Sequence, residues 1–259
     1  MFQEVNKAVK AMLDCCGEGK PMAKSEVLNE TWLLRMVLAL IHDNDPERIG
    51  VEKVETTLEL IKAAIDSRWI SEGGLEPAFE LEGTTWTDAI LGGVRINDKN
   101  KRGIDIVSNL DVGVVVIEAK MGSALASGVS HSKHYNQAAR NIACLAKLVM
   151  KASDDKFLNN SAFVVLAPAC KLKEWEDGRK GAQTLINKAW EVIEAENRHR
   201  IWGDESRFKD VVNRIVKKSA AISWENVIES FKCDEALQLK SFYEAVCEEY
   251  DIPTQFSNI

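Results

Sequence analysis

Three ionisable residues in the middle of the chain have the types and the spacing of a metal-dependent hydrolytic site. Asp105 lies in the segment 103–107, and Glu118 and Lys120 lie two residues apart in the segment 116–120. Residues two apart on a β-strand point to the same face of the sheet. Two carboxylates can bind Mg²⁺ and leave room for water and phosphate, and a neighbouring ammonium group can orient the water and offset charge on the phosphate.

The elements that must position these residues are two predicted strands. Apolar residues dominate 103–107 and 112–120, and the intervening Ser-Asn-Leu-Asp, 108–111, is typical of a turn. So short a connection predicts an antiparallel hairpin, with Asp105 across from Glu118 and Lys120. The alternative is a solvent-facing Asp105 and an exposed Glu118–Lys120 ion pair that contributes only about 0.2–1 kcal/mol.

The rest of the chain is mostly helical in its periodicity. The apolar run 161–168 predicts a strand buried on both faces, and strand-like alternation also covers 75–82 and 89–96. A short last strand is predicted at 220–224. Helical spacing is found at 27–41, 51–65, 132–150, 182–197, 205–217, 225–231 and 235–250.

The segments 103–107 (GIDIV), 116–120 (VIEAK) and 135–140 (YNQAAR) together resemble the PD-(D/E)XK nuclease superfamily. The resemblance covers about 75–170, plus the last strand. It implies an α/β fold: a restriction-endonuclease-like core with a mixed central sheet flanked by helices, here with an N-terminal helical extension. It also implies that Asp105 and Glu118 bind Mg²⁺ or Mn²⁺, that Lys120 is catalytic, and that Gln137, beside Tyr135, faces the site.

Two further carboxylates are candidates for the same site, because the family often places an acidic residue on an early helix. Glu30 precedes the first buried helix, where it could equally stabilise the helix dipole. Asp88 is the second candidate, with a turn or helix-capping role as its alternative. Gln137 lies on the flank of its helix, and could shield the edge of the core rather than enter the site.

Candidate nucleic-acid contacts come from two basic groups. Lys101 and Arg102 lead directly to Asp105. Lys133 and Arg140 begin a line of basic residues that Lys147 and Lys151 continue along the helix predicted at 132–150. Such a line can follow a phosphate backbone, but it is more often a solvated helix face.

Composition sets the limits of these interpretations. The chain has 259 residues, 46% of them hydrophobic and 28% charged, which suits one domain. We expect an N-terminal helical part (1–70), a nuclease core (71–170) and a helical C-terminal part (171–259). No apolar run reaches the roughly 20 residues of a membrane span. The six cysteines show no zinc-binding pattern, so a soluble cytoplasmic protein is expected.

The leading functional hypothesis is a magnesium-dependent nuclease that acts on DNA, as a homodimer if it cuts both strands. The net charge of −7 counts mildly against nucleic-acid binding. The first alternative is therefore a catalytically weak module of the same fold that binds nucleic acid or protein. A scaffold whose seven tryptophans anchor partners is the second. The motifs G-x-G-x-x-G, G-x-x-x-x-G-K-[ST], G-x-S-x-G and H-E-x-x-H are absent, which disfavours nucleotide-binding, serine-hydrolase and zinc-protease functions.

Overall fold

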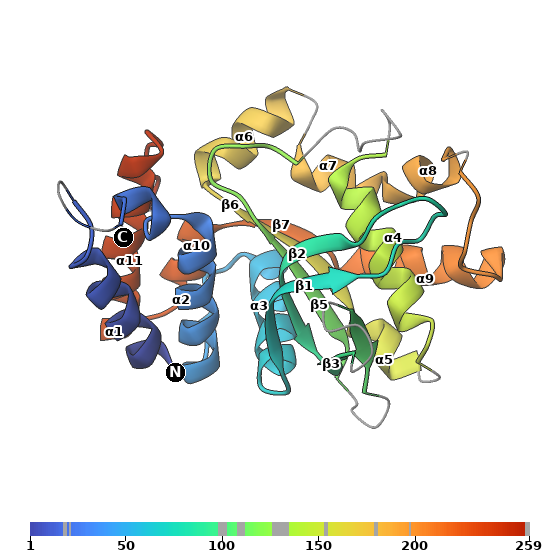
Figure 1. Ribbon diagram of the computed structural model, residues 1–259, viewed down its shortest axis with the longest axis horizontal. Coiled ribbons are helices and arrows are strands. Elements are labelled where there is room, and N and C mark those ends of the chain that lie inside the picture. Colours follow the sequence, from blue (N-terminus) through green and yellow to red (C-terminus); the bar gives the residue numbers. More distant parts are fainter. Residues whose placement is uncertain are drawn as a thin grey trace.

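The computed structural model places a mixed β-sheet between two layers of helices (Figure 1). It describes residues 1–17, 20, 22–97, 103–107, 112–125, 135–152, 155–178, 181–196 and 198–256. The main sheet has five strands in the order β1-β2-β5-β6-β7. The pairs β1–β2 and β2–β5 are antiparallel, and β5–β6 and β6–β7 are parallel. The strands are β1 (Trp69–Leu75), β2 (Thr85–Gly92), β5 (Val114–Ala119), β6 (Ala162–Ala167) and β7 (Ala220–Ser223).

The two central strands explain the apolar runs in the sequence. Every residue of β5 and β6 is buried, because helices cover both faces of the sheet there. The predicted strand at 161–168 is therefore confirmed. The predicted last strand is also confirmed: β7 extends the sheet beside β6, and Trp224 begins the next helix.

One layer of helices packs on the sheet face formed by Ala89, Ile117 and Leu166. Helix α2 is nearly enclosed within this layer, with eight of its fourteen residues buried. In Figure 1, α1, α2, α10 and α11 lie together beyond one side of the sheet, whereas α3 lies directly against it. The layer comprises α1 (Phe2–Leu13), α2 (Glu30–Asp43), α3 (Glu52–Ile65), α10 (Trp224–Glu229) and α11 (Asp234–Glu249).

The second layer covers the face formed by Ile90, Val116 and Val165. Helix α4 presents its buried apolar side to the sheet, and α9 packs against both α4 and β6. The layer comprises α4 (Gln137–Val149), α5 (Asp155–Asn159), α7 (Ala182–Asn187), α8 (Ala189–Glu194) and α9 (Glu205–Lys218). In addition, α6 (Ala169–Asp177) follows β6, and a 3₁₀ turn, η1 (Lys24–Glu26), precedes α2.

The predicted hairpin between 103–107 and 112–120 is wrong. Strand β4 (Ile104–Ile106) pairs with β3 (Val94–Ile96) in a separate two-stranded sheet, and β5 pairs with β2 and β6 instead. The physical reason is burial: a strand as apolar as β5 needs neighbours on both edges and helices on both faces. Gly92, whose φ is +108°, is the last residue of β2, and the chain turns there into β3. A Cβ at this position would overlap the carbonyl oxygen of Gly113.

The boundary expected for the N-terminal helical part is slightly displaced. Strand β1 begins at Trp69, inside the range 1–70, because Trp69–Leu75 pairs along its length with β2. The long helix expected over 132–150 begins at Gln137 within the described residues, where Asn136 caps it by accepting a hydrogen bond from the Ala139 amide. Among the described segments, no helix is both long and apolar enough to cross a membrane.

Candidate active site

Strand register brings Asp88 and Glu118 to the same level of the sheet. Strand β2 runs antiparallel to β5, with Ala89 opposite Ile117. One step further along each strand, Asp88 is level with Glu118. Directly opposite residues of an antiparallel pair project to the same face, so these two carboxylates share the face that α4 covers.

Glu118 is the most deeply buried carboxylate of this group, with 3% of its surface exposed. Its Oε1 atom lies 2.7 Å from Nζ of Lys120. The same Oε1 accepts a hydrogen bond from Nε2 of Gln137, the first residue of α4. Its Oε2 atom is buried without a hydrogen-bond partner. A carboxylate oxygen left unsatisfied in the interior is costly unless a ligand or cation completes it.

Asp88 and Glu30 hold the backbone where β5 ends. Oδ2 of Asp88 accepts a hydrogen bond of 2.7 Å from the Ala119 amide. Oε2 of Glu30 accepts one of 3.0 Å from the Met121 amide. Glu30 is the first residue of α2, whose cap Asn29 accepts a hydrogen bond from the Trp32 amide. Both layers of helices therefore contribute to the site, α2 through Glu30 and α4 through Gln137.

The backbone of Lys120 is fixed independently of its side chain. Its amide donates to the Leu166 carbonyl at 2.8 Å, and its carbonyl accepts a 3.1 Å hydrogen bond from Nε1 of Trp224. These bonds tie the end of β5 to β6 and to α10. These hydrogen bonds position Lys120 so that its ammonium group contacts Glu118. The Lys120 side chain is 13% exposed.

Burial is the main cause of the raised pKa values of the three carboxylates in this site. Burial, reinforced by Asp88 and Glu30 and opposed by Lys120, raises the pKa of Glu118 to about 7. Burial likewise raises the pKa of Asp88 and of Glu30, although Lys120 opposes both shifts. Burial acts to lower the pKa of Lys120, but the carboxylates of Glu118, Asp88 and Glu30 outweigh it and the pKa is raised. One ammonium group thus faces three carboxylates.

Asp105 does not join this group, which corrects the site deduced from the sequence. It lies on β4, opposite Arg95 of β3, and its Oδ2 accepts a 2.9 Å hydrogen bond from Nδ2 of Asn97. The structure therefore separates Asp105 from Glu118, because the hairpin that would have joined them is not formed. Asp88, the second candidate from the sequence, holds the position opposite Glu118 instead.

Glu72 is a residue near the site that sequence reasoning missed. It lies on β1, between the pairs Ser71–Ala89 and Gly73–Thr87, and so level with Asp88. Its backbone is left-handed, with φ 55°, which is uncommon for a residue with a Cβ. Its charge contributes to raising the pKa of Asp88. The sequence offered one signal, the adjacent Gly73 and Gly74, which mark irregular backbone without identifying the carboxylate.

Of the four basic residues expected to contact nucleic acid, the structure describes only Arg140. Lys101, Arg102 and Lys133 lie outside the described residues. Arg140 is engaged within the protein: its Nε lies 2.8 Å from Oε1 of Glu82, a side chain only 2% exposed, and its Nη2 donates to the Gly83 carbonyl at 2.9 Å.

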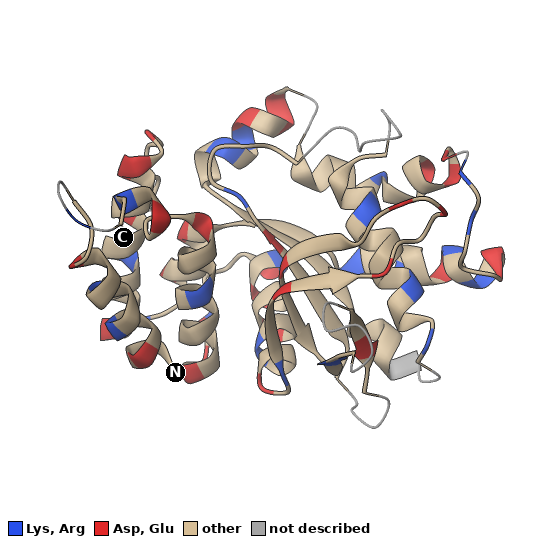
Figure 2. Cartoon of the chain, viewed as in Figure 1, with Lys and Arg blue, Asp and Glu red and all other residues tan. Residues whose placement is uncertain are grey.

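Lys147, on α4, and Lys151, just beyond the C-terminal end of α4, contact the same segment of the chain. Nζ of Lys147 donates to the Pro77 carbonyl at 2.8 Å, and Nζ of Lys151 pairs with Glu76 at 3.1 Å. The described part of the basic line therefore clamps the segment 76–84 against α4. Figure 2 shows basic and acidic residues interspersed on the surrounding helices.

The fit of a metal ion rests on two carboxylates. No group of three or more His, Cys, Asp or Glu side chains in the described ranges is arranged to hold a metal ion. Mg²⁺, however, commonly binds one or two carboxylates and keeps several waters. Asp88 and Glu118 provide such a pair, and the unsatisfied Oε2 of Glu118 is a free ligand atom.

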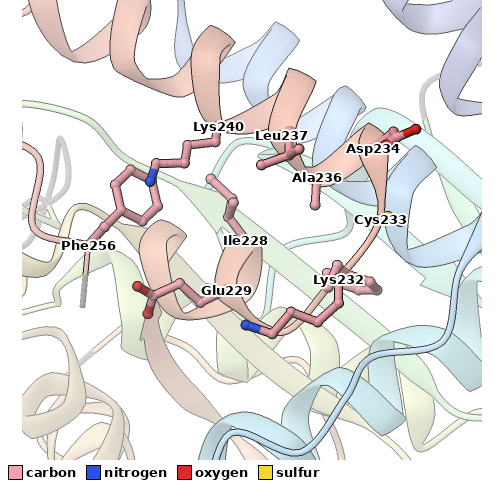
Figure 3. Close-up of a pocket in the computed structure, with 10 residues that line it drawn as sticks. Ile228, Glu229, Lys232, Cys233, Asp234, Ala236, Leu237, Lys240 and Phe256 are labelled. Carbon is pink, nitrogen blue, oxygen red and sulfur yellow. The ribbon is translucent and has the colours of Figure 1, made fainter. Parts of the chain in front are cut away.

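A cavity of about 490 Å³ lies away from these carboxylates, between α10, α11 and the C-terminal segment. In Figure 3, Ile228 and Leu237 lie at the middle of the cavity lining, and the ammonium group of Lys240 lies over the ring of Phe256. Its lining contains none of the site residues described above. The cavity therefore says nothing about the chemistry at the end of β5.

Comparison with known proteins adds no relative. No protein-family model, curated protein or solved structure matches the chain.

Proposed function

We propose that this protein is a magnesium- or manganese-dependent nuclease of the PD-(D/E)XK type, which hydrolyses phosphodiester bonds in DNA. The proposal keeps Glu118 and Lys120, and replaces Asp105 with Asp88. The observation that carries it is the buried cluster in which Asp88 and Glu118 are level across β2 and β5, with Lys120 bonded to Glu118.

The order of the elements supports a restriction-endonuclease-like core. An early helix carries Glu30, a strand carries Asp88, its neighbour carries Glu118 and Lys120, and the next helix of the main fold carries Gln137. The following strand, β6, returns parallel to β5. Glu118, Lys120 and Gln137 are the residues that the PD-(D/E)XK resemblance implies, and Asp88 takes the place that it gave to Asp105.

The donor set fits a divalent cation held by Asp88 and Glu118, with Glu30 beside them. Burial is the main cause that raises the pKa of each of these three carboxylates, and only one ammonium group, that of Lys120, opposes it. When bound, the cation would polarise the phosphodiester and lower the pKa of a bound water.

The protein's own residues have distinct tasks in this proposal. Gln137 and Lys120 both hold Oε1 of Glu118, which leaves Oε2 available as a ligand atom. Lys120 also brings a positive charge to the place where negative charge develops on the phosphate. Glu30 fixes the backbone at Met121, and so the position of the Lys120 segment.

The test is cleavage of plasmid, single-stranded DNA and RNA with Mg²⁺ or Mn²⁺, together with Mn²⁺ binding followed by electron paramagnetic resonance. We expect metal-dependent cutting by the wild type, and its loss in Glu118→Ala, Lys120→Ala and Asp88→Asn proteins shown to be folded by circular dichroism. Glu118→Ala and Asp88→Asn should also lose Mn²⁺ binding, whereas Lys120→Ala should retain it. Cutting that persists in all three variants would refute the assignment of the site.

One observation favours a catalytically weak binding module instead. Oε1 of Glu118 is already engaged by Lys120 and Gln137, and no described group offers three metal ligands. An ion pair closed in this way needs no metal. Absence of both Mn²⁺ binding and cleavage in the wild type, with DNA or RNA still bound, would establish this second function.

A further inference from the structure

Arg35 is a cationic side chain held at the edge of the candidate site. It lies on α2, five residues after Glu30, with its guanidinium carbon 4.5 Å from the centroid of the Trp32 ring. Its Nε donates to Oγ of Ser71, on β1, at 3.4 Å. The Trp32 ring and the Ser71 hydroxyl thus both orient the guanidinium group.

Glu72 provides the acidic partner of Arg35. Its Oε1 lies 3.7 Å from Nη2 of Arg35, and 66% of its side chain is exposed. This carboxylate stands level with Asp88 on the neighbouring strand, so Glu72 lies one strand from Asp88 and two strands from Glu118 in the sheet. The left-handed backbone of Glu72 interrupts the alternation of β1 at this level.

The Arg35–Glu72 pair is open to exchange. At 3.7 Å it is longer than a charge-assisted hydrogen bond, and exposed pairs of this kind contribute little to stability. By contrast, Lys120 is 13% exposed and bonded to Glu118 at 2.7 Å. Arg35, 27% exposed and paired only at 3.7 Å with Glu72, is therefore the more available of these two cations. A guanidinium fork matches the oxygens of a phosphate better than one carboxylate oxygen at long range.

We propose that Trp32, Arg35 and Ser71 form a subsite for a backbone phosphate of a nucleic-acid strand, next to the phosphodiester at Asp88 and Glu118. Glu72 pairs with the guanidinium group of Arg35 when no nucleic acid is bound, and the phosphate displaces the Glu72 carboxylate. The identity of the ligand rests on the proposed function. The subsite supplies a phosphate contact that Arg140, clamped to Glu82, does not offer.

The two members of the pair then have opposite effects on binding. Arg35→Gln removes a phosphate contact, and should weaken binding of DNA about 10- to 100-fold, in line with a hydrogen bond to a charged group. It should also reduce the slope of log Kd against log salt by about one, as the loss of one phosphate contact does. Glu72→Gln removes the competing carboxylate, and should tighten binding several-fold with the salt slope unchanged.

The measurement is fluorescence anisotropy of a fluorescein-labelled DNA duplex and of the matching single strand, with Ca²⁺ in place of Mg²⁺, from 50 to about 300 mM salt. Arg214→Gln is the matched control, since Arg214 pairs with Asp210 at 2.8 Å on α9, in the other layer of helices. The control should bind as the wild type does.

Each outcome separates this subsite from the nuclease proposal. If Arg35→Gln binds like the wild type with the same salt slope while the wild type cuts DNA, the subsite is refuted and the nuclease stands. If both variants weaken binding and lower thermal stability equally, the pair is structural and the subsite is again refuted. If the opposite effects occur without any cleavage, the subsite is upheld and the nuclease proposal fails. If the wild type binds neither probe, the subsite falls.

Discussion

Neutralising Glu118 should stabilise the metal-free protein at alkaline pH, although it should abolish the proposed activity. The carboxylate is 3% exposed, and its pKa is raised from 4.5 to about 7, first by burial and then by Asp88 and Glu30, against the opposing effect of Lys120. A glutamine at this position mimics the protonated carboxyl group in shape and in charge. Glu118→Gln therefore removes a charge that the fold accommodates poorly.

The magnitude follows from the shift in pKa. The difference between 4.5 and about 7, at about 1.4 kcal/mol per pKa unit, corresponds to about 3 kcal/mol. Because the pKa in the folded protein is the higher one, the folded state binds the proton more tightly. The stabilisation is therefore complete below pH 4.5 and is lost as the pH rises through about 7. The wild type should be less stable at pH 8 than at pH 5 for this reason, and the variant should lack this part of the pH dependence.

The assays are urea unfolding and thermal unfolding of the wild type and Glu118→Gln at pH 5 and pH 8, with EDTA and then with Mg²⁺. In EDTA at pH 8 we expect the variant to be more stable by about 3 kcal/mol, with a melting temperature higher by roughly 6–10 °C. At pH 5 the difference should be small. Mg²⁺ should stabilise the wild type, by about 2.7 kcal/mol at a hundredfold excess over its Kd, and leave the variant unchanged.

A less stable variant at pH 8 in EDTA would refute this reasoning. It would mean that the Glu118–Lys120 pair is a net source of stability, as a buried pair with good hydrogen bonds can be. The site would then be a structural ion pair rather than a vacant set of ligands for a cation. A stabilising effect of Mg²⁺ that persists in Glu118→Gln would place the metal elsewhere.

Three further predictions follow from the same contacts. Asp88→Asn should reduce cleavage by at least about a hundredfold, whereas Asp105→Asn should stay within about threefold of the wild type, both measured as initial rates on plasmid DNA. Arg140→Gln should lower the unfolding free energy by about 3 kcal/mol, because it removes the 2.8 Å ion pair with the buried Glu82 carboxylate and leaves only the charge of Arg198 near it. Lys151→Gln, whose pair with Glu76 is exposed, should lower it by less than about 1 kcal/mol in the same urea titration. Gly92→Ala should cost about 3 kcal/mol or more, since φ is +108° and a Cβ would overlap the carbonyl oxygen of Gly113; a midpoint equal to that of the wild type would contradict the backbone geometry.

The elements that could be predicted from the sequence are those with strong local signals. The apolar run around Val164 and Val165 has no polar face, and it forms a strand buried on both sides. The regular apolar spacing of Val54, Leu58 and Ile61 gives a helix at the expected place. The mixed sheet flanked by helices is likewise in agreement with the fold expected.

Strand pairing could not be predicted in the same way. The turn-like residues 108–111 favoured a hairpin, because a short connection usually joins neighbouring strands. The actual neighbour of β5 is β2, whose Ala89 pairs with Ile117 across a long stretch of chain. Burial of both edges of β5 determines this choice, and burial is a property of the whole fold rather than of a few adjacent residues.

The same distinction between local signals and strand pairing applies to the residues of the candidate site. Glu118 and Lys120 share a strand, so period-two geometry alone placed them together, and they are 2.7 Å apart. Asp105 and Asp88 are both preceded and followed by residues suited to strands, and no local feature ranks them. Only the register, with Asp88 one step beyond the Ala89–Ile117 pair, decides between them. The E-x-K spacing is therefore a local feature of β5, whereas the carboxylate that lies level with Glu118 depends on which strand runs alongside β5.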